Sequence, residues 1–196
     1  MLVVLFGSPL NPLSGRAAQW LHHHHDLVLV VLPPGGTGGP SRIHPLHTLS
    51  EGLIGGQRLL RTGLRRLTRR RGGPVHSLAE FLAAWPEIPT VTADDWATVA
   101  ARIDAVWNGA PSARCLGLSA IFPRRIPPWV CGDAVAVNLH PGALPANRGP
   151  SPYFRTLTEG LPAVLTAHVL AERFDSGAVL AEAPVPCPEG ASEYRL

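Results

Sequence analysis

The chain has 196 residues, of which 45% are hydrophobic and 16% charged, which is typical of one folded domain over 1–196 and excludes a disordered chain. Its formal net charge is +3, and all 17 basic residues are arginine, so the number of arginines is weak evidence for nucleic-acid binding. The sequence has no cysteine pair with metal-ligand spacing, no secretory signal and no apolar run near 20 residues, so we expect a soluble, cytoplasmic protein without a structural metal or a membrane span.

The first part of the chain predicts a strand, a helix and a second strand. Residues 2–6 form a continuous apolar run that ends at Gly7, and residues 27–32 form another that ends at two prolines. Such runs are typical of buried strands. Residues 15–25, between the two runs, have the pattern of a helix. This order of elements is how a parallel α/β sheet begins.

The middle of the chain predicts helices. A Gly- and Pro-rich loop over 33–48 precedes an amphipathic stretch in which leucines and arginines fall on separate stripes. A later helix is expected to begin near Asp94 or Asp95, since a carboxylate there can cap its first turn. The predicted helices of this part cover 49–71, 76–85 and 93–106.

The last part of the chain alternates strands and helices again. Its clearest strand is β-branched and ends at Pro141-Gly142. Together with the earlier elements it predicts an α/β fold: a Rossmann-like, mostly parallel sheet with flanking helices. The expected strands cover 114–118, 134–140, 163–170 and 178–185, and the expected helices cover 151–160 and begin again near residue 190.

Two polar side chains, Asn138 and His140, lie at the end of the predicted strand 134–140. Because side chains alternate along a strand, both point to the same side, at the edge where open α/β sheets bind ligands. An amide donor beside an imidazole suits a carbonyl that becomes a tetrahedral oxyanion. Asp175 follows in a turn between two strands, where a carboxylate can favour a protonated imidazole or position a water for proton transfer. The same residues also fit a hydrogen-bonded loop and an ordinary turn.

Two sequence blocks resemble the motifs of one enzyme family. Residues 138–152 read Asn-Leu-His-Pro-Gly-Ala-Leu-Pro-Ala-Asn-Arg-Gly-Pro-Ser-Pro, which is similar to the signature of the folate-dependent formyltransferases. Residues 166–180, with Thr-Ala-His and then Phe-Asp-Ser-Gly, resemble the second motif of that family in order and spacing. The resemblance is close over 114–196, weaker over 1–32 and poor over 33–95.

The resemblance implies a reaction and a set of site residues. The expected reaction is transfer of a formyl group from 10-formyltetrahydrofolate, as co-substrate, to an amine. By resemblance Asn138, His140 and Asp175 are catalytic, with the first two steadying the oxyanion and the third organising proton transfer. His168 is expected to pack and hydrogen-bond beside Asp175, and Arg148 with its neighbouring glycine to shape the turn after the strand. Folate is expected to contact the backbone of Ala120, Ile121, Phe122, Ala171, Glu172, Arg173, Phe174 and Asp175.

The resemblance leaves more than one amine possible as the acceptor of the formyl group. The loop 7–11 differs from the phosphate loop of the glycinamide-ribonucleotide branch, and we expect no second, C-terminal domain like that of the methionyl-tRNA branch. The run after Arg148 is more similar to members that formylate small-molecule amines such as amino sugars, which we expect as the partner. Three alternatives remain open. The first two are formylation of methionyl-tRNA and hydrolysis of the formyl carrier. The third is an inactive or shortened family member that stops before the last helix of the catalytic domain.

Three further features have both a functional and a plain interpretation. The arginines from Arg58 to Arg71 fit either an anionic partner such as tRNA or a solvated helix face. The run His22–His25 fits either a transition metal or a favourable helix C-terminus. The run Gly35–Gly39 lacks the Gly-Lys-Ser/Thr ending of a phosphate cradle, so we expect a flexible loop there.

Overall fold

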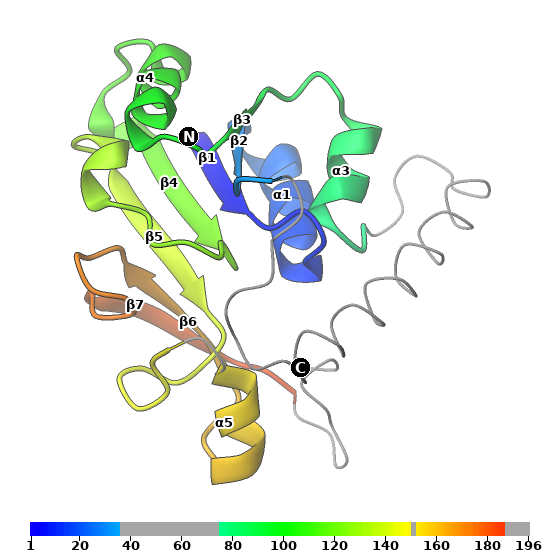
Figure 1. Cartoon of the computed structure of the whole chain (residues 1–196), viewed down its shortest axis with the longest axis vertical. Helices are drawn as coiled ribbons and strands as arrows, with labels where there is room; N and C mark the ends of the chain where they lie inside the picture. Colours follow the sequence, from blue (N-terminus) through cyan, green and yellow to red (C-terminus); the bar gives the residue numbers. More distant parts are fainter. Residues whose placement is uncertain (36–74, 150–151, 187–196) are drawn as a thin grey trace.

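A computed structural model of the chain describes residues 1–35, 75–149 and 152–186. These residues form one seven-stranded sheet with helices on both faces, as Figure 1 shows. The strands are β1 (Leu2–Gly7), β2 (Asp26–Leu32), β3 (Thr90–Thr92), β4 (Cys115–Ala120), β5 (Val135–His140), β6 (Val164–Val169) and β7 (Val179–Pro184).

The sheet has the order β3-β2-β1-β4-β5-β6-β7. Neighbours among β1 to β5 pair in parallel, whereas β6 pairs antiparallel with both β5 and β7. This arrangement confirms the predicted α/β class and the mostly parallel, Rossmann-like sheet with flanking helices. The point at which the sheet changes from parallel to antiparallel pairing lies between β5 and β6, next to the strand that carries the two predicted polar residues.

The helices that sequence patterns predict within the described residues are all present. None of these described helices is long and apolar enough to cross a membrane. The Arg-rich helix expected over 49–71 and the helix expected to begin near residue 190 lie outside the described residues. The α-helices are α1 (Pro12–His24), α3 (Leu78–Ala84), α4 (Trp96–Trp107) and α5 (Pro152–Glu159), and two short 3-10 helices are η1 (Ser112–Arg114) and η2 (Pro128–Cys131).

Capping side chains explain where the helices begin. The expected start of α1 at residue 15 was too late, because the Asn11 side chain accepts the backbone N–H of Leu13 at 2.8 Å and Pro12 occupies the first turn. The start of α4 near Asp94 or Asp95 is confirmed at Asp95, whose Oδ2 accepts the backbone N–H of Thr98 at 2.8 Å. The capping side chains therefore indicate the first residues of α1 and α4 more accurately than hydrophobic periodicity does.

Two strand assignments from the sequence need correction. The three-residue strand β3 (Thr90–Thr92) was missed, because a run this short shows no periodicity and its β structure comes from pairing with β2. The strand expected over 114–118 continues to Ala120, where Gly7 of β1 pairs with it. This extension places Ala120 within the sheet and not in the loop that follows.

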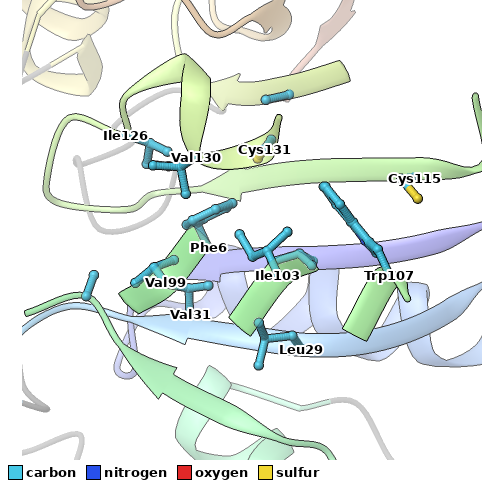
Figure 2. Close-up of a cluster of buried hydrophobic side chains, with 13 residues drawn as sticks. Phe6, Leu29, Val31, Val99, Ile103, Trp107, Cys115, Ile126, Val130 and Cys131 are labelled. Carbon is cyan, nitrogen blue, oxygen red and sulfur yellow. The ribbon is translucent and has the colours of Figure 1, made fainter. Parts of the chain in front are cut away.

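Alternation along β1 builds a core on each face of the sheet. Val4 and Phe6 face α4 and η2, whereas Val3 and Leu5 face α1 and α3. Figure 2 shows the first of these clusters, with Phe6 among the side chains of β2, α4 and η2. A strand buried on both faces reads as a continuous apolar run, which is why the sequence identified it readily.

Candidate active site

The end of β5 and the adjacent strand β6 bring the predicted polar residues together. In the antiparallel pairing of these strands, Asn138 lies opposite His168 and His140 lies opposite Thr166. The turn after β6 then returns Asp175 to the same place, within 3.4 Å of Nδ1 of His140. The structure thus assembles all three residues that the resemblance implies, together with His168.

Asp175 is the centre of this cluster. Its side chain is 9% exposed, and its Oδ1 lies 3.4 Å from Nδ1 of His140 and 3.5 Å from Nε2 of His168. Its Oδ2 accepts the backbone N–H of Gly149 at 3.1 Å. Oδ2 therefore faces a donor, and Oδ1 faces two imidazole nitrogens that become donors when their rings are protonated.

The turn that carries Asp175 is held in an uncommon conformation. Asp175 has φ of 51°, in the left-handed region that costs a non-glycine residue free energy. Nε of Arg148 donates to the Asp175 carbonyl at 2.8 Å, so Arg148 links the segment after β5 to the turn that carries Asp175. Gly177 closes the turn so tightly that a Cβ there would collide with the carbonyl of Val169.

Two backbone carbonyls determine which nitrogen of each histidine carries a proton. Nε2 of His140 lies 2.7 Å from the carbonyl oxygen of Asn147, and Nδ1 of His168 lies 2.9 Å from the carbonyl oxygen of Val169. A carbonyl oxygen only accepts, so each of these nitrogens is a donor. Each ring then turns its other nitrogen, the one that gains or loses a proton, toward Asp175.

Asn138 completes the group from the strand side. Its Nδ2 lies 3.1 Å from Nε2 of His168. This contact uses one of the two amide protons while the His168 ring is neutral, because a protonated Nε2 has no lone pair to accept it. Asn138 is half-buried, in contrast to His140 and His168, which are 4% and 1% exposed.

The electrostatics of the cluster favour an ionised carboxylate beside a protonated imidazole. Burial alone would raise the pKa of Asp175, but the hydrogen bond to His168, the N–H of Gly149 and the charge of His140 outweigh it and lower that pKa. The hydrogen bond to Asp175 raises the pKa of His168, against burial, with help from the contact to Val169. The arrangement can accept a proton at the carboxylate and donate hydrogen bonds to a developing oxyanion.

The two loops expected to contact folate lie near each other. Nη1 of Arg125 donates to the backbone carbonyl of Glu172 at 2.7 Å and to its Oε2 at 2.9 Å, which joins the loop after β4 to the loop after β6. Phe122 packs edge-on against Phe6, at 5.9 Å between ring centroids, so its half-buried ring packs against the core. Phe174 is 62% exposed.

The expected folate contacts differ in how accessible they are. Ala120 is fully buried at the end of β4, and its carbonyl accepts the hydroxyl of Ser14 at 2.5 Å. Ile121 follows with φ of 55°, which turns the chain out of the sheet. Ala171 is half-buried and Arg173 is exposed, in the turn that leads to Asp175.

Sequence reasoning missed Asn147, which holds His140 through its main chain. Asn147 is fully buried, and its Nδ2 donates to Thr156 Oγ1 at 3.0 Å in α5. The only available signal was its place between the strand and the Arg-Gly pair, because a main-chain carbonyl leaves no mark on residue type. The N–H of Gly149 was likewise invisible in the sequence as a donor to Asp175.

Within the described residues, the run His22–His25 packs against aromatic side chains. Among the described residues no three His, Cys, Asp or Glu side chains gather as metal ligands, and His22 packs against Trp85 at 5.2 Å between ring centroids. His24 stacks on Trp20 at 4.7 Å. The glycine run beyond Gly35 and the Arg-rich helix lie outside the described part of the chain.

Comparison with known proteins identifies the fold. No family model matches the sequence, and no curated protein matches it. Among solved structures, phosphoribosylglycinamide formyltransferase from Bacillus halodurans is similar over 99% of this chain and 84% of its own, with a TM-score of 0.64 at 15% identity. Glycinamide ribonucleotide transformylase 1 from Symbiobacterium toebii matches with a TM-score of 0.62 at 16% identity, over 100% of this chain and 77% of its own.

A sugar N-formyltransferase from Shewanella sp FDAARGOS_354 also matches 100% of this chain, with a TM-score of 0.54 at 17% identity. The chain spans 61% of the length of that sugar enzyme. At these identities the likeness concerns the course of the backbone. The chain therefore has the formyltransferase fold.

Proposed function

We propose that the protein transfers a formyl group from 10-formyltetrahydrofolate to an amine of a small molecule. The observation that carries the proposal is the buried contact of Asp175 Oδ1 with both His140 and His168. This cluster lies at the end of β5, beside the amide of Asn138. Formyl transfer needs both a proton acceptor and oxyanion donors, and the cluster holds both kinds of group within one small volume.

The proposed reaction begins with attack of a neutral amine on the formyl carbon. A carbon–nitrogen bond forms, and the carbonyl electron pair moves onto the formyl oxygen. The second amide proton of Asn138 and the Nδ1–H of protonated His140 stabilise this oxyanion. The 3.4 Å from Nδ1 of His140 to Asp175 is longer than a charge-assisted hydrogen bond, so this donor can be shared with a reacting oxygen.

Collapse of the intermediate requires proton movement. The attacking nitrogen loses a proton toward the Asp175 carboxylate, directly or through a water. The oxyanion's electron pair then re-forms the carbonyl as the bond from the formyl carbon to N10 of the folate breaks. N10 takes up the proton that Asp175 accepted, directly or through the same water, which restores the carboxylate. The products are the N-formyl amine and tetrahydrofolate. The lowered pKa of Asp175 keeps its carboxylate ionised at neutral pH, so that it holds the transferred proton only until N10 takes it up.

We place the folate along the two loops that Arg125 joins. The contacts of Arg125 with Glu172 hold the loop after β4 against the loop before Asp175. The proposed contacts are backbone groups of 120–122 and 171–175, and the exposed ring of Phe174 supplies an apolar face for a planar ligand. This placement sets the formyl group beside the catalytic carboxylate.

We propose a small-molecule amine, such as an amino sugar, as the acceptor. The support is the run from Arg148 to Phe154, which resembles members of the family that act on such amines. Part of this run builds the site, because Arg148 holds the Asp175 turn and α5 begins within the run, at Pro152. Acceptor choice is thus linked to the same loop that positions the catalytic carboxylate.

The test follows the folate spectrum of purified protein with 10-formyltetrahydrofolate, with and without a panel of amines. The proposal predicts loss of the formyl carrier that depends on an amine and disappears in Asp175→Ala. Release of formate without any amine would instead identify a hydrolase, because water would then replace the acceptor. Absence of both turnover and folate binding in folded protein would contradict the enzymatic proposal.

A further inference from the structure

A fully buried amide anchors the loop between β5 and α5. Nδ2 of Asn147 donates to the carbonyl of Pro152 at 2.9 Å and to Oγ1 of Thr156 at 3.0 Å, both in α5. The backbone N–H of Asn147 donates to the carbonyl of Ala143 at 2.7 Å. The residue is therefore held from the helix through its side chain and from the loop through its main chain.

The side chain of Asn147 makes its hydrogen bonds through Nδ2 and not through Oδ1. Within the described chain, Oδ1 of Asn147 is buried and has no hydrogen-bond partner. A Cβ at Gly142 would lie 2.8 Å from Nδ2, so the loop approaches the amide closely where residue 142 is a glycine. A side chain packed this tightly leaves the carbonyl of Asn147 little freedom to move.

That carbonyl faces the catalytic histidine. Its oxygen lies 2.7 Å from Nε2 of His140, and an oxygen that only accepts requires a proton on Nε2. A neutral imidazole has one nitrogen-bound proton, so Nδ1 is then the unprotonated nitrogen. Nδ1 is the atom that lies 3.4 Å from Oδ1 of Asp175.

We propose that Asn147 is a positioning residue for His140: its anchored carbonyl keeps the proton on Nε2 and turns Nδ1 toward Asp175. The functional consequence rests on the proposed formyl transfer, whereas the tautomer itself does not. If the carbonyl shifts, the neutral ring can carry its proton on Nδ1 and takes up a further proton on Nε2, away from Asp175. The charged Nδ1–H donor of the proposed mechanism then no longer forms by protonation beside the carboxylate.

The first experiment determines the tautomer of the wild-type protein. Side-chain nitrogen-15 NMR distinguishes a protonated imidazole nitrogen from an unprotonated one, and the spectrum of His140→Gln identifies the signals of His140. The proposal predicts a protonated Nε2 and an unprotonated Nδ1 in the neutral ring. The opposite pattern would overturn the proposal without any measurement of activity.

Two substitutions then loosen the anchor to different degrees. Asn147→Asp keeps the shape of the side chain but removes both donors, and Thr156→Val removes one acceptor while leaving Asn147 in place. Thr158→Val is the matched control, because Thr158 lies in the same helix, is exposed and bonds only to the carbonyl of Phe154 among the described residues. Thr156→Ser keeps the hydroxyl and should behave as the wild type.

We expect Thr156→Val to mix the two tautomers of His140 and Asn147→Asp to mix them further. Proton transfer contributes about 10²–10⁴-fold to the rate of such reactions, and the mixed tautomers should lose only a part of this contribution. We therefore expect kcat to fall about 5-fold in Thr156→Val and about 50-fold in Asn147→Asp. KM for the formyl carrier should stay near the wild-type value, because the folate loops are not altered. A purely structural role would lower the fraction of active protein and leave the tautomer unchanged.

The outcomes separate this inference from the proposed function. Unchanged His140 signals in a folded Thr156→Val or Asn147→Asp protein would overturn the role of Asn147, even with full activity. The expected signals in a wild type that transfers no formyl group would uphold the positioning of His140 and contradict the proposed reaction. If Asn147→Asp does not fold, Thr156→Val and the wild-type spectrum still decide the question.

Discussion

The Oδ1 oxygen of Asp175 lies 3.4 Å from Nδ1 of His140, although α5 and β6 separate the two residues along the chain. Both side chains are nearly fully buried, at 9% and 5% exposure. A carboxylate and an imidazole at this distance interact strongly, since little water screens them. The predictions below follow from this pair and from the groups that hold it.

Replacement of the carboxylate should abolish most activity. Asp175→Asn keeps the shape of the side chain but removes the proton acceptor, so we expect kcat for formyl transfer to fall about 10²–10⁴-fold. Affinity for the formyl carrier should change little, because the proposed folate contacts in this turn are mainly backbone groups. Asp133→Asn, at an exposed aspartate outside the site, is the control. Equal activity of the two variants would rule out the proposed role of Asp175.

Loss of the amide donor should slow the chemical step. Asn138→Leu removes the donor proposed for the oxyanion and the contact with His168, and we expect a loss of roughly 3 kcal/mol of transition-state stabilisation. Steady-state kinetics should show this loss in kcat, with KM for the formyl carrier nearly constant. A change confined to KM would indicate that Asn138 binds substrate without stabilising the transition state.

The salt bridge between the two proposed folate loops should affect binding more than chemistry. Arg125→Ala removes the contacts with Glu172, and from the usual worth of an exposed pair we expect up to about 5-fold weaker binding of the formyl carrier. Titration of folate fluorescence measures this affinity. Arg102→Ala, at an exposed position on α4, is the control. Unchanged affinity in Arg125→Ala would argue against folate in these loops.

The contact between His168 and Asp175 should make stability depend on pH. Because the folded state raises the pKa of His168, its contribution is complete below the unfolded value of 6.5 and is lost as pH rises through the folded pKa. Because the folded state lowers the pKa of Asp175, its contribution is present above 3.8 and is lost as pH falls through the folded pKa. His168→Gln should therefore lose more unfolding free energy at about pH 5.5 than at about pH 9 in urea denaturation. Equal losses at both pH values would contradict this coupling.

The turn of Asp175 should not tolerate a side chain at Gly177. Gly177→Ala places a Cβ against the carbonyl of Val169, so we expect a loss of stability of about 1–3 kcal/mol or more, with reduced activity because the catalytic turn moves. Gly160→Ala is the comparison, because its φ of 66° strains the backbone but no atom crowds the new Cβ. Thermal unfolding and kinetics of both variants measure the difference. A Gly177→Ala protein with wild-type activity would show that the turn can move without consequence.

The parts of the fold that the sequence predicted are those in which local pattern and burial agree. The apolar run of β1 is buried on both faces, and Asn138 and His140 alternate at the end of a strand, so their common side followed from strand geometry alone. The strand β3 was missed because pairing with β2, and not its own pattern, makes it a strand.

The contacts that hold His140 and Asp175 depend on main-chain groups and on the course of the backbone, which the sequence did not reveal. The carbonyl of Asn147 and the N–H of Gly149 hold His140 and Asp175, yet any residue type offers these atoms. The return of Asp175 to β5 depends on the antiparallel turn after β6, whose tight closure at Gly177 becomes visible only with the carbonyl of Val169 in place. The resemblance of motifs singled out Asn138, His140 and Asp175 in the sequence, and the structure shows which atoms bring them together.

The most direct measurement follows the formyl carbon itself. Carbon-13 NMR of the protein with [13C]formyl-labelled 10-formyltetrahydrofolate and an amino-sugar acceptor shows whether the label moves to the amine. The account predicts a new N-formyl signal on the acceptor with the wild type and its near absence with Asp175→Asn, which should still bind the folate. Label that stays on the folate with folded, folate-bound wild-type protein and every amine tested, or that appears only as free formate, would contradict formyl transfer.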